Sequence, residues 1–192
     1  MIRRNVVLSF AVAASVLLVA CSGGSAVDQS SGKYRYVTGL PVGKLFPIKH
    51  RGLAGLFTAE LLDGQTYSLA ADAGHVVVIN FWATWCGPCT TETPQFDLVY
   101  RRYKTRGVDF VGVDTKEGSQ DAPRAFVAEN NISYPIVFDE ETRTAVALGR
   151  VPAQTLPFTV LLDRHGRVAA VYNSVVTAKD LVNVLDSLVA ER

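Results

Sequence analysis

The amino-acid sequence predicts an α/β fold in which helices cover a central sheet on both faces. From about residue 55, short runs of β-branched and aromatic residues alternate with helix-like segments, an order typical of such layered folds. The runs HVVVINFW and VDFVGVD are mostly apolar, which indicates buried strands. The chain has 192 residues, of which 48% are hydrophobic, enough for one domain with a buried core plus extra segments.

The first 20 residues are expected to form a signal peptide. Arg3 and Arg4 precede an apolar run that reaches Ala20, and this run is shorter than the roughly 20 residues of a membrane span. The run ends in LVAC, which resembles the lipobox of bacterial lipoproteins and implies cleavage before Cys21 and lipidation of its thiol. An uncleaved anchor and ordinary secretion are the alternatives.

A flexible tether is expected over residues 21–44, followed by a folded domain over 45–192. The stretch SGGSAVDQSSGK is rich in serine and glycine and offers almost nothing apolar to bury. As flexible coil, some 20 residues would span about 25 Å. For residues 34–48, YRYVTGLPVGKLFPI, an arm packed on the domain is favoured over a tether, because this stretch includes aromatic and aliphatic anchors.

The folded part is expected to begin with a hairpin and a buried strand. In LFTAELLDGQTYSLA, two short strands flank the turn dipeptide Asp63-Gly64. The run HVVVINFW, residues 75–82, suits a strand buried on both faces. The helical pattern that follows runs to Tyr103 and contains Pro94.

Four further strands and three further helices are expected in the second half. The strands are VDFVGVD (108–114), YPIVFD (134–139), PFTVLLD (157–163) and VAAVYNS (168–174), and the helices are DAPRAFVAENN (121–131), EETRTAVALG (140–149) and TAKDLVNVLDSLVAER (177–192). Asp121 is expected to cap the first of these helices, with Pro123 in its first turn. Thr177 and Asp180 form a capping-box pattern at the last.

The cysteine pair in CGPC points to redox chemistry. If Cys21 carries lipid, Cys86 and Cys89 remain as one pair. A zinc site needs about four ligands, and none of the three histidines lies at ligand spacing from the pair, so no metal is expected. A structural disulfide closing so small a ring would constrain the unfolded chain little. A strand leading into CxxC at a helix start favours a redox-active disulfide, with no other cofactor.

The position of each cysteine predicts its role. Cys86 stands at the N-terminus of the helix, where partial positive charge and free N–H groups stabilise a thiolate. Cys89 lies one turn further along and is expected to be more buried. Cys86 should therefore attack the client disulfide, and Cys89 should resolve the mixed disulfide.

The segment VVVINFWATWCGPC resembles the active-site strand and motif of the thioredoxin superfamily. The additional segment DAPRAFVAENNISYPIVFDEE and the late FTVLLDRHGRV make the chain more similar to the membrane-tethered TlpA/ResA-like thiol-disulfide oxidoreductases, over roughly residues 55–189. The resemblance implies a thioredoxin fold: a central mixed sheet flanked by helices, with an N-terminal β-hairpin and a central insertion.

The resemblance also assigns roles to single residues. Pro157 matches the cis-proline that faces the CxxC motif, while Pro152 is a weaker candidate because it lies further from the strand. Pro94 matches the proline of the active-site helix. Glu92 matches an acidic residue one turn after the second cysteine, where a carboxylate could exchange a proton with Cys89. A solvated surface glutamate is the alternative.

Two positions depart from the family pattern. Asn80 stands where cytoplasmic thioredoxins have a buried aspartate, so acid-base assistance must come from Glu92 or from water. Phe158 follows the cis-proline candidate, where threonine is common, which puts substrate preference in doubt. Trp82 is expected in the core or at the rim of the site. The residues expected to contact substrate are Trp85 at the rim, Gly87, Pro88, Leu156 and Pro157, with the main chain of Leu156 pairing with an extended client.

The resemblance implies a lipid-anchored enzyme on the outer face of the cytoplasmic membrane. The Gly-Pro dipeptide and the lack of a histidine between the cysteines favour a reductase, which needs electrons from a transmembrane thiol donor. Apocytochrome c, during cytochrome c maturation, is the client that the family suggests. The alternatives are an oxidant or isomerase for secreted proteins and a non-catalytic binding lipoprotein. A monomer is expected, and the balanced charge, formally +1 without a basic run, gives no indication of nucleic-acid binding.

Overall fold

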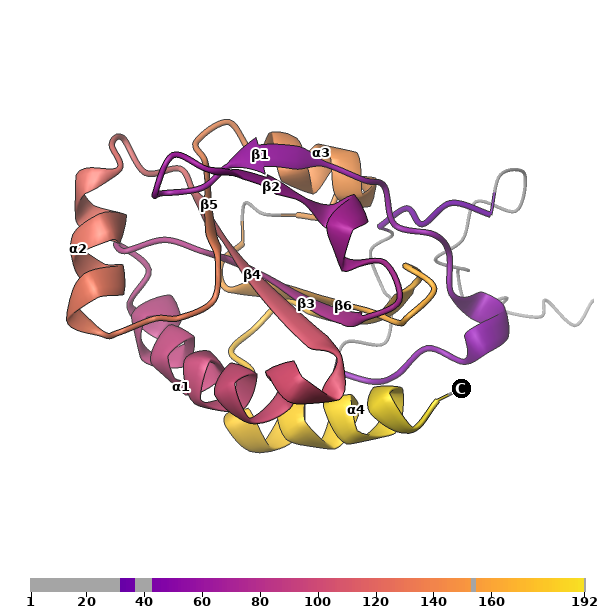
Figure 1. Ribbon diagram of the computed structural model, residues 1–192. Coiled ribbons are helices and arrows are strands. Elements are labelled where there is room, and N and C mark those ends of the chain that lie inside the picture. The colour runs from indigo at the N-terminus through magenta and orange to yellow at the C-terminus, as the bar shows by residue number, and fades with distance from the viewer. Residues whose placement is uncertain (1–31, 37–42, 153–154, 192) are drawn as a thin grey trace, which may run out of the picture.

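Figure 1 shows the computed structural model, which describes residues 32–36, 43–152 and 155–191. The strands are β1 (Thr58–Glu60), β2 (Thr66–Ser68), β3 (Val76–Trp82), β4 (Val108–Thr115), β5 (Ile136–Asp139), β6 (Phe158–Leu162) and β7 (Val168–Tyr172). The helices are α1 (Gly87–Tyr103), α2 (Asp121–Glu129), α3 (Arg143–Gly149) and α4 (Ala178–Ala190), with short 3-10 turns at Ile48–His50, Leu69–Asp72 and Lys104–Arg106. The predicted signal peptide and Cys21 lie outside the described residues.

A five-stranded mixed sheet in the order β5-β4-β3-β6-β7 forms the centre of the domain. Strand β3 runs parallel to β4 and antiparallel to β6, and Ile79 pairs with Val111 on one side and with Val160 on the other. All seven residues of β3 are buried. This confirms the α/β architecture and the expectation of a strand buried on both faces.

Two apolar cores lie on opposite faces of this sheet. Helices α1 and α4 lie together over one face, whereas α3 and the β1-β2 hairpin cover the other (Figure 1). Successive residues of β3 alternate between the cores: Trp82 belongs to the α1 side and Phe81 to the α3 side. The side chains of β3 that face α1 are therefore the ones that can contact groups on that helix.

Most of the expected element boundaries are confirmed. The β1-β2 hairpin turns at Asp63-Gly64, and α1 continues through Pro94 to Tyr103. The Thr177 hydroxyl accepts a hydrogen bond from the Asp180 amide at the start of α4, as the capping-box pattern predicts.

The predicted cap of α2 is wrong. Gln120 occupies the N-cap position without a side-chain hydrogen bond, and Asp121 is the first residue of the helix. The hydroxyl of Ser119 instead accepts a hydrogen bond from the Asp121 amide, the first N–H of the helix. Asp121 still places a negative charge near the positive end of the helix dipole. None of the described helices is long and apolar enough to cross a membrane.

The folded domain begins before residue 45, which corrects the predicted extent of the tether. Tyr34 is 4% exposed and belongs to the core on the α3 side. Its amide donates to the Leu53 carbonyl, and the Tyr36 amide donates to the Gly149 carbonyl. Gly149 has φ +132°, and a Cβ there would lie 2.6 Å from the Tyr34 ring, so only glycine fits beneath the tyrosine. Burial of this aromatic ring offsets the entropy of ordering the arm.

Replacing Tyr34 with alanine should destabilise the domain by about 3 kcal/mol, because it empties a buried aromatic site. Denaturant unfolding measures this change. Tyr34→Phe is the matched control: the tyrosine hydroxyl is buried and has no hydrogen-bond partner among the described residues, so its removal should leave stability unchanged or higher. Equal stability of Tyr34→Ala and the wild type would contradict the packed arm.

Candidate active site

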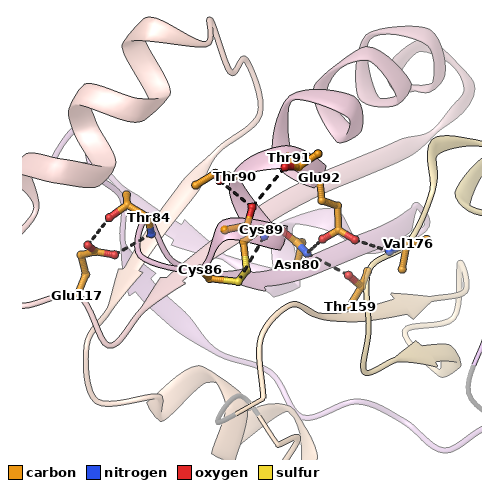
Figure 2. Close-up of a disulfide and its surroundings, with 11 residues drawn as sticks. Asn80, Thr84, Cys86, Cys89, Thr90, Thr91, Glu92, Glu117, Thr159 and Val176 are labelled. Atoms are coloured by element: carbon orange, nitrogen blue, oxygen red, sulfur yellow. Dashed lines mark hydrogen bonds between the residues drawn. A yellow bond between two sulfur atoms is a disulfide. The ribbon is translucent and has the colours of Figure 1, made fainter.

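The CGPC motif lies where β3 ends and α1 begins. Cys86 is the N-cap residue of α1, and its Sγ accepts a hydrogen bond from the Cys89 amide at 3.3 Å (Figure 2). Gly87 and Pro88 are the first helical residues, where proline is tolerated because its missing N–H would have no partner in the helix. The predicted strand-CxxC-helix arrangement is therefore present.

Cys86 and Cys89 form a disulfide with an S–S distance of 2.04 Å, so the structure is that of the oxidised protein. Cys86 is 6% exposed and Cys89 is fully buried. The order of exposure agrees with the expectation that Cys86 meets the client first. The roles of attacking and resolving cysteine stay predictions.

The peptide bond between Leu156 and Pro157 is cis, as expected, and it is the one cis bond among the described residues, so the alternative at Pro152 is wrong. Phe158 pairs with Phe81 in the antiparallel β3-β6 ladder, so Pro157 lies level with Trp82, the last residue of β3, at the same edge of the sheet as the CGPC loop. Leu156 is partly buried against both cores.

The two tryptophans have different environments. Trp85 is 58% exposed beside Cys86, which agrees with a place at the rim, and its indole N–H donates to the Lys116 carbonyl at 3.1 Å. Trp82 is fully buried, and its ring packs against Phe126 of α2 with centroids 5.2 Å apart. Trp82 is therefore a core residue, and of the two tryptophans only Trp85 is exposed.

Glu92 is buried, with 2% of its surface exposed, so the surface alternative is wrong. One carboxylate oxygen accepts from the Asn80 side-chain amide at 3.1 Å, and the other accepts from the Val176 backbone amide at 2.5 Å (Figure 2). Asn80 also donates to the Thr159 hydroxyl at 3.0 Å. Asn80, where the chain differs from cytoplasmic thioredoxins, thus donates a hydrogen bond to Glu92, the acidic residue that the resemblance assigned to the site.

The environment of Glu92 suits proton exchange at neutral pH. Burial raises the pKa of this carboxyl to about 7, against the opposing effect of the hydrogen bonds from Val176 and Asn80. The Asn80 Oδ1 atom is buried and has no hydrogen-bond partner in the part of the chain that the structure describes. Rotation of this amide would present Oδ1 to a protonated Glu92, so Asn80 can pair with either protonation state.

Sequence reasoning missed a second acidic group beside the motif. Glu117 is buried in the loop after β4, and its carboxylate accepts hydrogen bonds from the Thr84 amide, at 2.9 Å, and from the Thr84 hydroxyl (Figure 2). The available signal was an acidic residue just after the strand VDFVGVD. The carboxyl ends of parallel strands meet at one edge of a sheet, so a loop after a neighbour of β3 could reach the CGPC loop.

Comparison with known sequences identifies a family. The Redoxin family profile matches residues 41–187. The chain is 35% identical over 121 residues to the thiol-disulfide oxidoreductase ResA of Halalkalibacterium halodurans, covering 63% of this chain and 66% of that protein. It is 31% identical over 132 residues to ResA of Geobacillus thermodenitrificans, covering 69% of this chain and 74% of that protein.

Solved structures agree with these sequence relatives. A DsbF homologue from Corynebacterium diphtheriae superposes with a TM-score of 0.77 at 32% identity, covering 81% of this chain and 99% of that one. A secreted thiol-disulfide isomerase from Corynebacterium glutamicum gives a TM-score of 0.77 at 28% identity, covering 83% and 99%. The fold is therefore the thioredoxin fold that the sequence predicted.

Proposed function

The chain belongs to the Redoxin family and is a ResA-like thiol-disulfide oxidoreductase, and from this premise we propose that it reduces client disulfides outside the cytoplasm. The observation that carries the proposal is the buried Cys86–Cys89 disulfide at the start of α1, with the protonatable Glu92 one turn further along the same helix.

The proposed reaction transfers two electrons from the cysteine pair to the client. In the reduced protein, the Cys86 thiolate attacks one sulfur of a client disulfide, forming a mixed disulfide and releasing the other client sulfur as a thiolate, which takes a proton from water. The Cys89 thiolate then attacks Cys86 Sγ, which restores the Cys86–Cys89 disulfide and releases the second client thiol. The membrane thiol donor expected from the sequence would reduce the pair again.

Glu92 is proposed to accept the proton of Cys89 in the second step. The two residues are separated by three positions of α1, which puts them on the same side of the helix. None of the hydrogen bonds among the described residues joins Glu92 to either cysteine in the oxidised state, where Cys89 carries no proton. A bridging water or a side-chain rotation in the reduced state would carry the proton to the carboxylate.

The direction of the reaction is supported by the dipeptide between the cysteines. Gly87 and Pro88 are those of reducing thioredoxins, and histidine, as found in strongly oxidising members, is absent between the cysteines. An isomerase is the second candidate, because the secreted structural relative from C. glutamicum is described as one. Apocytochrome c, with its CxxCH disulfide, is the proposed client.

The direction can be tested by measuring the reduction potential together with rates on two substrates. A reductase of apocytochrome c should have a potential near the ≈ −270 mV of thioredoxin and should reduce a CxxCH peptide disulfide faster than it rearranges scrambled ribonuclease. A potential near the ≈ −120 mV of DsbA, or faster rearrangement than reduction, would overturn the proposed direction.

Labelling of the reduced protein should identify Cys86 as the attacking thiol. Alkylation at mildly acidic pH should modify Cys86 first, because it caps α1 and is the more exposed cysteine. Mass spectrometry of the peptides locates the label. Modification of Cys89 first would reverse the two roles.

The membrane attachment is proposed from the lipobox-like end of the predicted signal peptide. The mature protein would begin at Cys21 with a lipidated thiol, and the residues up to Tyr34 would connect it to the domain. Cys21→Ser should abolish labelling by radioactive palmitate and leave an unprocessed precursor. Unchanged labelling of that variant would rule out this anchor.

A further inference from the structure

The loop that carries Cys86 is held by the loop that follows β4. Besides the two hydrogen bonds from Thr84 to the Glu117 carboxylate, the Trp85 indole N–H donates to the Lys116 carbonyl. Lys116 has φ +58°, a left-handed conformation that is uncommon for a residue with a side chain. Three hydrogen bonds therefore connect two consecutive residues before Cys86 to two consecutive residues of this loop.

Asp114 lies behind this contact. It is fully buried at the C-terminal end of β4, where it pairs with Trp82 in the parallel ladder. Neither of its carboxyl oxygens accepts a hydrogen bond from any described residue. Glu117 follows three positions later in the adjoining loop, near enough for its negative charge to disfavour ionisation of Asp114. Two ionised carboxylates cannot hydrogen-bond to each other, because both only accept, and a buried carboxylate without donors is costly.

A single proton on one of the two carboxyl groups removes their charge repulsion. The hydrogen-bond donors around each group determine which of the two carries that proton. Glu117 already accepts from the amide and the hydroxyl of Thr84, which stabilises its ionised form. Asp114 receives no hydrogen bond from the residues that the structure describes, so its neutral form is favoured. Burial, followed by the charge and the hydrogen bond of Glu117, raises the pKa of Asp114 to about 8.

We propose that Asp114 and Glu117 share one proton and together position the Cys86 loop: neutral Asp114 donates its O–H to the Glu117 carboxylate, which in turn holds Thr84. Both are positioning residues, since neither contacts a cysteine sulfur. When Asp114 loses its proton, two buried carboxylates face each other. Their repulsion displaces Glu117 from Thr84 and releases the loop at mildly alkaline pH. The inference that this affects catalysis rests on the redox function proposed above.

The indole N–H signals give a direct readout of the loop. The chain has two tryptophans, so its ¹H–¹⁵N spectrum contains two indole signals, and that of Trp85 reports the bond to Lys116. In the oxidised wild-type protein, the Trp85 signal should shift with a midpoint of about pH 8. Asp114→Asn keeps a donor toward Glu117 but cannot ionise, so its Trp85 signal should stay at the low-pH position up to pH 9.5 or so.

A reciprocal variant separates a shared proton from a merely structural role. In Glu117→Gln, the opposing charge is absent and an amide can donate to Asp114, so the midpoint should move down by about one pH unit or more. The exposed Glu129→Gln is the control and should leave the midpoint unchanged. An unchanged midpoint in Glu117→Gln, or a persisting transition in Asp114→Asn, overturns the proposal.

The wild-type protein supplies a measurement that does not depend on a variant folding. The ¹³C signal of the Asp114 carboxyl should show the protonated form at pH 6.5. Titration of Asp114 near the ordinary aspartate value, about 4, would overturn the proposal. Neither measurement needs a client or turnover. A result that supports the proton-sharing pair is therefore independent of whether the protein is a reductase, and a result that contradicts the pair leaves the proposed reductase function intact.

Discussion

Replacing Cys89 with serine should convert the protein from a catalyst into a trap. The Cys86 thiolate would still attack a client disulfide, but the second step has no thiolate, so each molecule should retain one client in a mixed disulfide. Turnover should fall from many clients per protein to at most one. Non-reducing gels and mass spectrometry measure the adduct, and a small dithiol should release it.

Cys86→Ser is the matched control for this trap. Cys89 is fully buried whereas Cys86 is not, so a protein that retains only Cys89 should form little or no adduct. Equal trapping by both variants would show that either thiol can meet the client. The assignment of Cys86 as the attacking residue would then fail.

Glu92→Gln should remove a step from the pH dependence of turnover. With a pKa of about 7, Glu92 is ionised and able to accept the Cys89 proton above that pH. Resolution of the mixed disulfide should therefore speed up through neutral pH in the wild type. In the variant it should be slower by a factor of about 10² or more at pH 7.5, a typical effect of losing a general base. Stopped-flow measurement of single-turnover resolution tests this.

The same substitution makes a prediction about stability. The folded-state pKa of Glu92 lies above its ordinary 4.5, so between pH 4.5 and 7 the folded protein binds more protons than the unfolded chain. The free energy of unfolding should fall over this range by about 3 kcal/mol for this group. Glu92→Gln should lack that fall, whereas the exposed Glu129→Gln should show the wild-type curve. Parallel curves for Glu92→Gln and the wild type would indicate a carboxyl that titrates as if it were exposed.

The sequence alone was sufficient for the fold class and for the redox pair. The run of β-branched and aromatic residues in β3, with Asn80 as its one polar residue, predicted burial on both faces, and the spacing of Cys86 and Cys89 at a helix start predicted a redox-active disulfide. These signals are local. A run of consecutive apolar residues indicates a buried strand, and residue types that favour the first turn of a helix indicate where the helix begins. The resemblance to a known family supplied Pro157, whose cis bond no periodicity could have indicated.

The limits of sequence reasoning appear where a residue's partners come from distant segments. The aromatic residues at positions 34–36 favoured a packed arm, but composition alone could not place the start of the domain before residue 45. The structure decides it, because Tyr34 finds its site against Leu53 and Gly149, residues of two other segments.

What the sequence determined by itself is therefore the layered fold, the place of the cysteine pair and its chemistry. Only the tertiary structure decided the acid-base groups around that pair. Glu92 accepts from Val176, which lies 84 positions away, and Glu117 accepts from Thr84, 33 positions away. The pKa of a carboxyl depends on how far other segments exclude water from it and which donors they supply. Those quantities exist only once the chain has folded, so a glutamate that could have been a surface residue became a buried group able to exchange a proton.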